Sequence, residues 1–163
     1  IARRQRQMCI RDRFLLKPEN HHYIHQVASI HVQMLYEQRH SNKKTVSQME
    51  IALYEEMIER RLRYTQDWLG VMREDDDRVQ AYGWAHFDGT SQTVTIESLY
   101  VTPAYRKQGY AEQFKQEIEQ WAIKRGAHQL IGKVDKNNEA MIALNQKLGY
   151  QVEKYTMVKN LEH

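Results

Sequence analysis

The centre of the chain reads Tyr100-Val101-Thr102-Pro103-Ala104-Tyr105-Arg106-Lys107-Gln108-Gly109-Tyr110-Ala111. Apolar residues alternate before this segment, over residues 93–101, which predicts a strand, and they recur at helical spacing after it, over residues 112–125. The turn between them carries two cations, Arg106 and Lys107, and a glycine, Gly109, which lets a ligand approach the backbone closely. Because the first N–H groups of a helix lack partners and the helix dipole favours anions, this arrangement predicts a phosphate or pyrophosphate site.

This turn and its surroundings resemble the signature of the GNAT family of N-acetyltransferases. The family pattern Gln/Arg-x-x-Gly-x-Gly/Ala is matched by Arg106, Gly109 and Ala111. Two further segments are similar to the family in order and spacing, namely Ile96-Glu97-Ser98-Leu99-Tyr100-Val101-Thr102-Pro103 before the turn, and Asn138-Glu139 followed by Lys147-Leu148-Gly149-Tyr150 after it. The resemblance runs from about Val94 to Leu161 and is faint before that. From the residues alone, an ordinary strand–turn–helix unit with a solvated basic turn remains the alternative.

Apolar periodicity outlines one domain over residues 14–160. Helices are predicted over residues 20–38, 47–63, 112–125 and 138–148. Strands are predicted over residues 14–16, 68–72, 79–87, 93–101, 129–134, 151–153 and 155–159. Ser47 and Glu50 have the spacing of a capping box at the start of the second helix. The pattern is that of an α/β fold, and the resemblance implies a mixed, twisted sheet of about six to seven strands flanked by four helices, a GNAT-like acyl-CoA N-acyltransferase fold.

Both ends of the chain are expected to be foreign to the native domain. The segment from Arg3 to Arg13 matches the translation of a transposase adapter used in DNA sequencing libraries, and Leu161-Glu162-His163 resembles the start of a vector-encoded histidine tag. We therefore expect residues 1–13 to be a sequencing-adapter artefact and residues 161–163 a tag remnant. Residues 1–13 hold five arginines and one aspartate, so the net charge of +3 becomes −1 without them and 0 when Glu162 is removed as well. The charge therefore gives little reason to expect a nucleic-acid partner; the alternative is that the basic arm is a nucleic-acid tail.

Several classes of function are excluded by composition. No run of about 18 apolar residues and no secretory signal is visible, so we expect a cytoplasmic protein without a membrane partner. The only cysteine, Cys9, lies in the first segment, which leaves no disulfide or thiolate chemistry in the domain. His21, His22, His25 and His31 could bind a metal, since His21 and His25 are four residues apart, but no carboxylate or further ligand clusters with them. We therefore interpret all four as residues on the polar face of a surface helix and expect no metal. The acidic turn at residues 74–77 could attract a cationic substrate or form a solvated hairpin tip.

The resemblance assigns the turn to acetyl-CoA, which would be the co-substrate. The pyrophosphate would rest on the amides of Gln108, Gly109, Tyr110 and Ala111, with Arg106 and Lys107 nearby.

The pantetheine arm would pair with the backbone of Leu99, Tyr100 and Val101, in a splay between the strands at residues 93–101 and 129–134. In this family such a splay follows a bulge in the first of these strands, and a free N–H near Leu99 or Tyr100 would then stabilise the oxyanion. Asn138 would either cap its helix or bond the pantetheine arm.

Glu97 is the expected general base. It lies on the central predicted strand, a few residues before the turn, where many members of the resembled family place a glutamate. A primary ammonium has a pKa of about 10, so a carboxylate acting through water would have to remove its proton at pH 7. The alternative is that Glu97 faces solvent or pairs with a lysine on a neighbouring strand. Strand alternation places Ser98 on the opposite face, which would prevent the pair from acting on one ligand.

Asn145 stands where the resembled family usually has a tyrosine that acts as general acid. An amide can donate a hydrogen bond but supplies no proton at neutral pH. We expect Asn145 to contact the cofactor near its sulfur, the alternative being a polar residue on a solvated helix face. Since a thiol has a pKa of about 8.5, the leaving thiolate can be protonated by water, or by Tyr155 if that residue reaches it.

The leading interpretation is an acetyl-CoA-dependent N-acetyltransferase that acts on a primary amine of a small molecule or a protein. Asn145 supports an alternative, a CoA-binding regulatory domain without turnover. A third interpretation is an acetylating toxin that modifies charged tRNA, which would need a native basic patch. The expected partners are acetyl-CoA and an amine acceptor, and a homodimer is considered only by analogy with the family.

Overall fold

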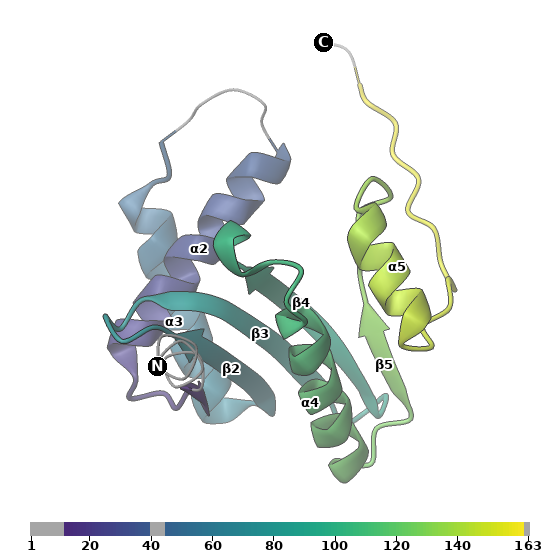
Figure 1. The fold of residues 1–163 in the computed structure, drawn as a ribbon, viewed down its shortest axis with the longest axis horizontal. Helices are drawn as coiled ribbons and strands as arrows, with labels where there is room; N and C mark the ends of the chain where they lie inside the picture. Colours follow the sequence, from purple (N-terminus) through teal and green to yellow (C-terminus); the bar gives the residue numbers. More distant parts are fainter. Residues whose placement is uncertain (1–11, 40–44, 162–163) are drawn as a thin grey trace, which may run out of the picture. The chain divides into compact units, whose positions relative to one another are not determined.

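The computed structural model describes residues 12–39 and 45–161, with the side chain of Arg39 left out. The chain divides into two compact units, residues 1–132 and residues 133–163, and each is considered by itself (Figure 1). Within the described ranges, none of the helices combines the length and the apolar character that a membrane span requires.

A sheet of five strands in the order β1-β2-β3-β4-β5 forms the centre of the first unit. The strands are β1 (Arg13–Leu15), β2 (Asp67–Arg73), β3 (Val79–Asp88), β4 (Thr93–Val101) and β5 (Gln129–Gly132). Neighbouring strands are antiparallel except for β4 and β5, which are parallel and connected through a helix. The mixed α/β class is therefore confirmed, and β5 ends two residues earlier than the sequence predicts.

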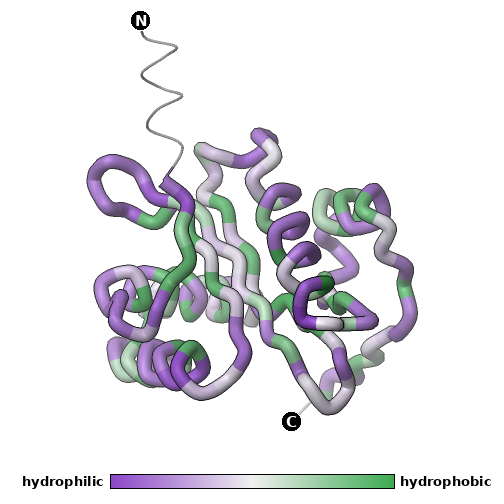
Figure 2. Tube along the Cα trace, turned by 90° about the horizontal axis from the view of Figure 1, so that it is seen from below, coloured by the Kyte–Doolittle hydropathy of each residue, from purple (hydrophilic) through white to green (hydrophobic). Residues whose placement is uncertain are grey.

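Helices cover both faces of this sheet, as Figure 2 shows from below. The helices α2 (His21–Arg39) and α3 (Gln48–Tyr64) pack on one face, where their apolar stripes share a core with alternate residues of β2 and β3. The helix α4 (Tyr110–Lys124) packs on the other face through Tyr110, Phe114 and Ile118. Because both faces are covered, β2 and β3 are buried along most of their length.

Two glycines face each other on the inner strands, Gly70 on β2 and Gly83 on β3. A Cβ at Gly70 would lie 2.5 Å from the ring of Trp68, so the indole lies directly over the glycine. A Cβ at Gly83 would lie 3.3 Å from Phe114, which lets α4 pack closely against β3. These contacts hold α4 in place, and its N-terminus carries the predicted anion site.

The described residues of the second unit, 133–161, contain one helix, α5 (Glu139–Lys147), ended by Gly149 at φ +91°. Residues 150–161 form neither helix nor strand, and residues 151–161 are exposed. The predicted strands at residues 151–153 and 155–159 are therefore wrong for this structure, and the described sheet has five strands instead of six or seven. The alternating apolar residues that suggested these strands, among them Val152 and Tyr155, have no strand partner here.

The predicted capping box is also absent. Ser47 precedes α3 in an extended conformation, but its side chain makes no capping hydrogen bond. Glu50 instead accepts a hydrogen bond from the hydroxyl of Tyr36 on α2. The side chain of Glu50, which the local pattern assigns to the cap of α3, therefore bonds to α2 instead.

Candidate functional site

The basic turn reaches α4 through a short 3-10 helix, η1 (Pro103–Tyr105). Gly109 at the N-cap has φ +86°, a conformation that glycine adopts at little cost, and a Cβ built there meets nothing within 4 Å. The first bond of the helix runs from Gln113 N–H to the Gly109 carbonyl at 3.0 Å, so the amides of Tyr110 and Ala111 precede it. This geometry gives a helix N-terminus with open space beside its glycine.

The cations of this turn differ in how they are held. The Arg106 Nε donates to the carbonyl oxygen of Val101 at 3.0 Å, which ties the turn back to the end of β4. Lys107 has φ +61°, an uncommon conformation for a residue with a side chain. Both residues are exposed. The predicted group of Arg106, Lys107 and Gly109 thus lies together in the first unit.

A β-bulge interrupts β4 at Glu97. Trp84 on β3 faces Ser98, while the next residue, Ala85, faces Ile96, so Glu97 is left without a partner on β3. An extra residue of this kind bends a strand and changes which face the following side chains take. The resemblance to the acetyltransferase family implied a bulge in this strand, and the register between β3 and β4 locates it at Glu97.

The pairing between β4 and β5 ends just before this bulge. Its register begins with Thr93 opposite Gln129 and stops with Ile96 opposite Gly132. Residues 97–101 of β4 continue along β3 but have no partner on β5. Among the described strands, the edge of β4 from Glu97 to Val101 therefore has no partner on the side where the pantetheine arm is expected.

The bulge corrects the prediction that Ser98 and Glu97 point to opposite faces. Val94 and Ile96 pack on the α4 side, and strict alternation would place Ser98 there as well. Instead Ser98 Oγ lies 2.8 Å from the hydroxyl of Tyr82 and 3.1 Å from Nδ1 of His31 on α2. Glu97 reaches the same side, since its carboxylate lies 3.4 Å from Arg61 Nη2 on α3. Both residues face the α2 and α3 layer because one extra residue shifts the alternation.

Arg61 pairs with Glu97 as part of a larger polar network, in place of the lysine of a neighbouring strand that one alternative predicted. Glu97 is also exposed, as the other alternative, a solvent-facing side chain, predicted. Arg61 Nε lies 2.9 Å from Asp67, a carboxylate with no exposed surface, and its guanidinium lies 4.6 Å from the centre of the Trp84 ring. Asp67 further accepts from Trp84 Nε1 at 2.6 Å and lies 2.6 Å from His86 Nδ1. The carboxylates of Asp67 and Glu97 share the single guanidinium of Arg61, which leaves net negative charge around Glu97.

The interpretation of His31 as a surface histidine is wrong, because the residue is partly buried and lies against Ser98. It was not a predicted site residue. It lies four residues after Val27 and three before Met34, so the spacing that marks the buried face of α2 could have indicated it. Burial lowers the pKa of the His31 imidazole below its usual value, and the negative charge of Glu97 partly opposes this shift. The shift favours the neutral ring near pH 7.

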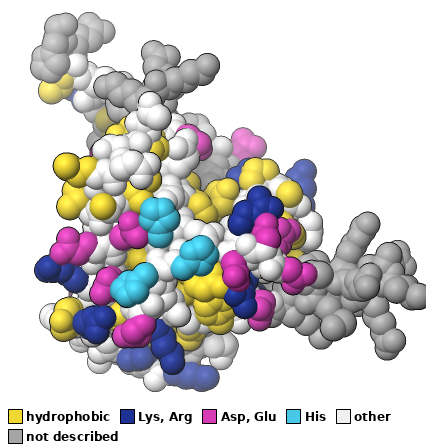
Figure 3. Space-filling view, turned by 90° about the vertical axis from the view of Figure 1, so that its left-hand side faces the viewer, with side chains coloured by type: hydrophobic (Ala, Val, Ile, Leu, Met, Phe, Trp, Pro, Cys, Tyr) yellow, Lys and Arg dark blue, Asp and Glu magenta, His cyan; other side chains and the backbone are white. Residues whose placement is uncertain are grey.

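The other histidines that suggested a metal pair with carboxylates of α3. His25 Nδ1 lies 3.0 Å from Glu55 and His21 Nδ1 lies 3.6 Å from Glu59. Figure 3 shows histidine and acidic side chains gathered on one face of the molecule. The residues that the structure describes contain no group of three or more side chains arranged for a metal ion. The acidic turn at residues 74–77 is a hairpin tip in which Asp76 and Asp77 pair with arginines.

Asn138 and Asn145 belong to the second unit. Asn138 caps α5, since its Oδ1 accepts from Met141 N–H at 3.2 Å. This confirms the capping role that the sequence left open. Asn145 is only 7% exposed, and its Oδ1 is buried without a hydrogen-bond partner among the described residues. A solvated helix face, the alternative for Asn145, is therefore wrong.

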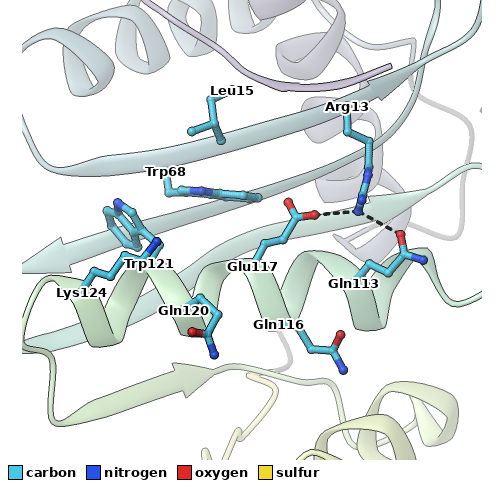
Figure 4. Close-up of a pocket in the computed structure, with 9 residues that line it drawn as sticks. All are labelled: Arg13, Leu15, Trp68, Gln113, Gln116, Glu117, Gln120, Trp121 and Lys124. Carbon is cyan, nitrogen blue, oxygen red and sulfur yellow. Dashed lines mark hydrogen bonds and ion pairs between the residues drawn. The ribbon is translucent and has the colours of Figure 1, made fainter. Parts of the chain in front are cut away.

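A separate cavity of about 580 Å³ lies along α4, on the side of β1 and β2. Figure 4 shows Arg13 reaching across it to Glu117 and Gln113, at 2.7 and 2.9 Å. Its lining includes Trp68 and Trp121 but no residue of the basic turn. This cavity is distinct from the region around Glu97.

Known sequences and structures identify the family of this chain. A model of the acetyltransferase (GNAT) family matches residues 32–150, and the chain belongs to that family. It is 30% identical over 69 residues to an aminoglycoside N(6')-acetyltransferase type 1 from Acinetobacter genomosp. 13. That match covers 42% of this chain and 47% of the relative, so it spans about half the length of the relative.

Solved structures agree on the fold. A protein described as a GNAT family acetyltransferase from Staphylococcus aureus subsp. aureus is 35% identical, with a TM-score of 0.66 over 74% of this chain and 98% of that one. AAC(6')-Iy, solved in complex with the bisubstrate analog CoA-S-monomethyl-acetylneamine, has a TM-score of 0.64 at 15% identity, over 93% of this chain and 98% of that one. At that identity the likeness shows the fold alone.

Proposed function

We propose that this protein transfers the acetyl group of acetyl-CoA to a primary amine. Family membership and the fold support the reaction class. The observation that carries the proposal is the bulge at Glu97, which coincides with the end of pairing between β4 and β5. The bulge brings two features together on β4. The backbone edge after it has no partner on β5, and the carboxylate of Glu97 faces the layer of α2 and α3.

The residues present fit acetyl-CoA. The open space at Gly109 and the exposed cations Arg106 and Lys107 suit a pyrophosphate at the N-terminus of α4. The open edge of Leu99, Tyr100 and Val101 suits an amide-containing arm that pairs like a strand.

The second unit offers a candidate ligand contact of its own at Asn145. Its buried Oδ1 has no partner among the described residues, and a buried polar atom of this kind needs one. We propose that the ligand supplies that partner and that the bound molecule contributes an activated acetyl thioester.

The chain's own groups would prepare the acceptor amine. Negative charge shared by Glu97 and Asp67 around Arg61 favours a cationic acceptor. Glu97 is proposed to draw a proton from the bound ammonium through a water molecule, which frees the nitrogen lone pair. A backbone N–H on the open edge of β4, near Leu99 or Tyr100, is proposed to stabilise the oxyanion.

The acceptor is proposed to be a small-molecule amine or a protein amine. The curated relative is named for aminoglycosides, so a set of aminoglycosides is a reasonable first screen, with polyamines and lysine peptides beside it. Release of free CoA thiol from acetyl-CoA reports turnover with any of them.

A single carboxylate substitution tests the proposal. Glu97→Gln should lower turnover about 100-fold at pH 7 and leave the affinity for CoA nearly intact. Glu119→Gln, which changes an exposed carboxylate on α4, is the control and should behave like the wild type. Wild-type protein that binds acetyl-CoA but acetylates none of the amines would favour the regulatory CoA-binding alternative. Unchanged turnover in Glu97→Gln would remove Glu97 from the proton transfer.

A further inference from the structure

His31 is held rigidly beside the bulge of β4. Its Nδ1 lies 3.1 Å from Ser98 Oγ. Its ring lies against Tyr54 on α3, with centroids 5.1 Å apart, and against Trp84 on β3, with centroids 6.0 Å apart. The ring is only partly exposed. His31 is held by residues of three elements and is open on part of its surface. It is therefore better placed to transfer a proton than His21 and His25, which pair with carboxylates at the surface of the same helix.

A chain of contacts links the ring to Tyr82 and Met34. The hydroxyl of Tyr82 donates to Met34 Sδ at 3.7 Å, and its oxygen lies 2.8 Å from Ser98 Oγ, which lies 3.1 Å from His31 Nδ1. If Ser98 donates to Tyr82 and Nδ1–H donates to Ser98, the proton of the neutral ring lies on Nδ1 and Nε2 keeps a basic lone pair.

The charges around the ring are compatible with a proton acceptor. Burial lowers the pKa of His31, while Glu97 on β4 favours the charged form. The other ionisable groups that face it are Tyr82 on β3 and Tyr54 on α3, and burial raises the pKa of Tyr82 so that its phenol is neutral. Arg61 on α3 balances part of the charge on Glu97. A neutral imidazole near the carboxylate of Glu97 can take up a proton, and the negative charge of that carboxylate then stabilises the imidazolium.

Resting on the proposed function, we infer that His31 is the final acceptor of the proton that the acceptor ammonium loses. One N–H bond of the ammonium breaks, its electron pair stays on nitrogen, and one N–H bond forms at His31 Nε2. Glu97 and water carry the proton between the two. The imidazolium returns the proton to solvent or to the departing thiolate, which becomes the thiol, before the next turnover. An imidazole is ordinarily a stronger base than a carboxylate, and the negative charge of Glu97 opposes the effect of burial on the pKa of His31.

The variant His31→Asn separates proton transfer from packing. The asparagine amide can place an N–H where Nδ1–H lies, toward Ser98, but it has no basic nitrogen. His25→Asn is the matched control, since His25 lies on the same helix, is exposed, and pairs with Glu55 at 3.0 Å. The measurements are CoA affinity and the pH profile of turnover with the acceptor found for the wild type.

His31→Asn should lose about 100-fold in turnover at pH 7, with CoA affinity retained. The loss should shrink as the pH rises toward the pKa of the amine, because the variant depends on acceptor that has already lost its proton. A loss that is equal at every pH would show a structural role and overturn the inference, as would turnover close to that of the wild type.

A second measurement is independent of turnover. Nitrogen-15 NMR of the wild-type imidazole should show the proton on Nδ1 and a free Nε2 at pH 7. The opposite tautomer would overturn the inference even if acetyl transfer is confirmed. Wild-type protein without turnover on any amine would instead count against the proposed function, while the NMR result still tests the assignment of the ring.

Discussion

The carboxylate of Asp67 has no exposed surface and is surrounded by hydrogen-bond donors. Thr65 Oγ1 donates to it at 2.7 Å, in addition to its contacts with Arg61, Trp84 and His86. An ionised carboxylate is stable in such a place only while its partners remain. Nothing in the local sequence distinguishes Asp67 from an ordinary residue at the start of a strand, because its partners come from α3 and β3.

Asp67→Asn should lower the free energy of unfolding by about 3 kcal/mol, since it breaks a buried ion pair and leaves donors without their acceptor. Urea unfolding followed by fluorescence measures this value. Asp76→Asn is the control, because Asp76 is exposed and pairs with Arg78 within its own turn, so the loss there should be much smaller. Equal, small losses in both variants would show that the network around Asp67 contributes little to stability.

The buried position of His31 gives the stability a pH dependence. Because burial lowers the pKa of the folded imidazole, the unfolded chain binds more protons below about pH 6.5, and stability falls as the pH decreases through that range. Unfolding in urea at pH 7.5 and pH 5.5 should therefore show a smaller loss for His31→Asn than for the wild type. The same pH dependence in both proteins would mean that His31 does not titrate in this way.

At the scale of elements, the turn and the helix after it were predictable because their signals are local. A glycine, two cations and a helical apolar stripe lie within one short segment, and Gly109 takes the left-handed conformation that the turn needs. The face of Ser98 was not predictable, since it depends on one extra residue in the register between β3 and β4. The failure of the capping box at Ser47 has the same origin, a contact of Glu50 with another helix.

Strand β1 is a short element whose first residue falls in the segment that we propose to be foreign. Asp12 lies 2.8 Å from Arg73 and Arg13 lies 2.7 Å from Glu117. These ion pairs are partly exposed, and such pairs contribute little, so removing residues 1–13 should lower the melting temperature by about 4 °C or less.

Removing residues 1–16 provides the comparison for this truncation. It also deletes Leu16, which is buried and donates its N–H to the Leu69 carbonyl at 2.8 Å. Its melting temperature should fall further than that of the shorter truncation. A large loss already on removing residues 1–13 would contradict the proposal that these residues lie outside the native domain.

At the scale of the whole molecule, the sequence overestimates the number of strands. Alternation of apolar and polar residues over residues 151–159 predicts two strands, but a strand also needs a partner, and that information is not local. Val152, Tyr155 and Met157 are instead 67%, 88% and 94% exposed. The class of fold survives this error because the strands that position the site are formed within the first unit.

Limited proteolysis tests the end of the chain. Lys154 and Lys159 are exposed and lie outside any helix or strand, whereas Lys124 is exposed but helical. Trypsin should therefore cut after Lys154 and Lys159 well before it cuts after Lys124, as mass spectrometry of timed samples would show. Equal protection at all three lysines would mean that residues 151–159 are paired, as the sequence suggests.

The most direct measurement is calorimetric titration of acetyl-CoA into the wild-type protein and two glycine variants. Gly109 and Gly126 flank α4 at its two ends, both have positive φ, and a Cβ at either meets nothing within 4 Å. Micromolar binding to the wild type and to Gly126→Trp, with loss of binding in Gly109→Trp, is the expected result. Folded wild-type protein that does not bind acetyl-CoA, or binding that survives in Gly109→Trp, would contradict a cofactor site at the N-terminus of α4.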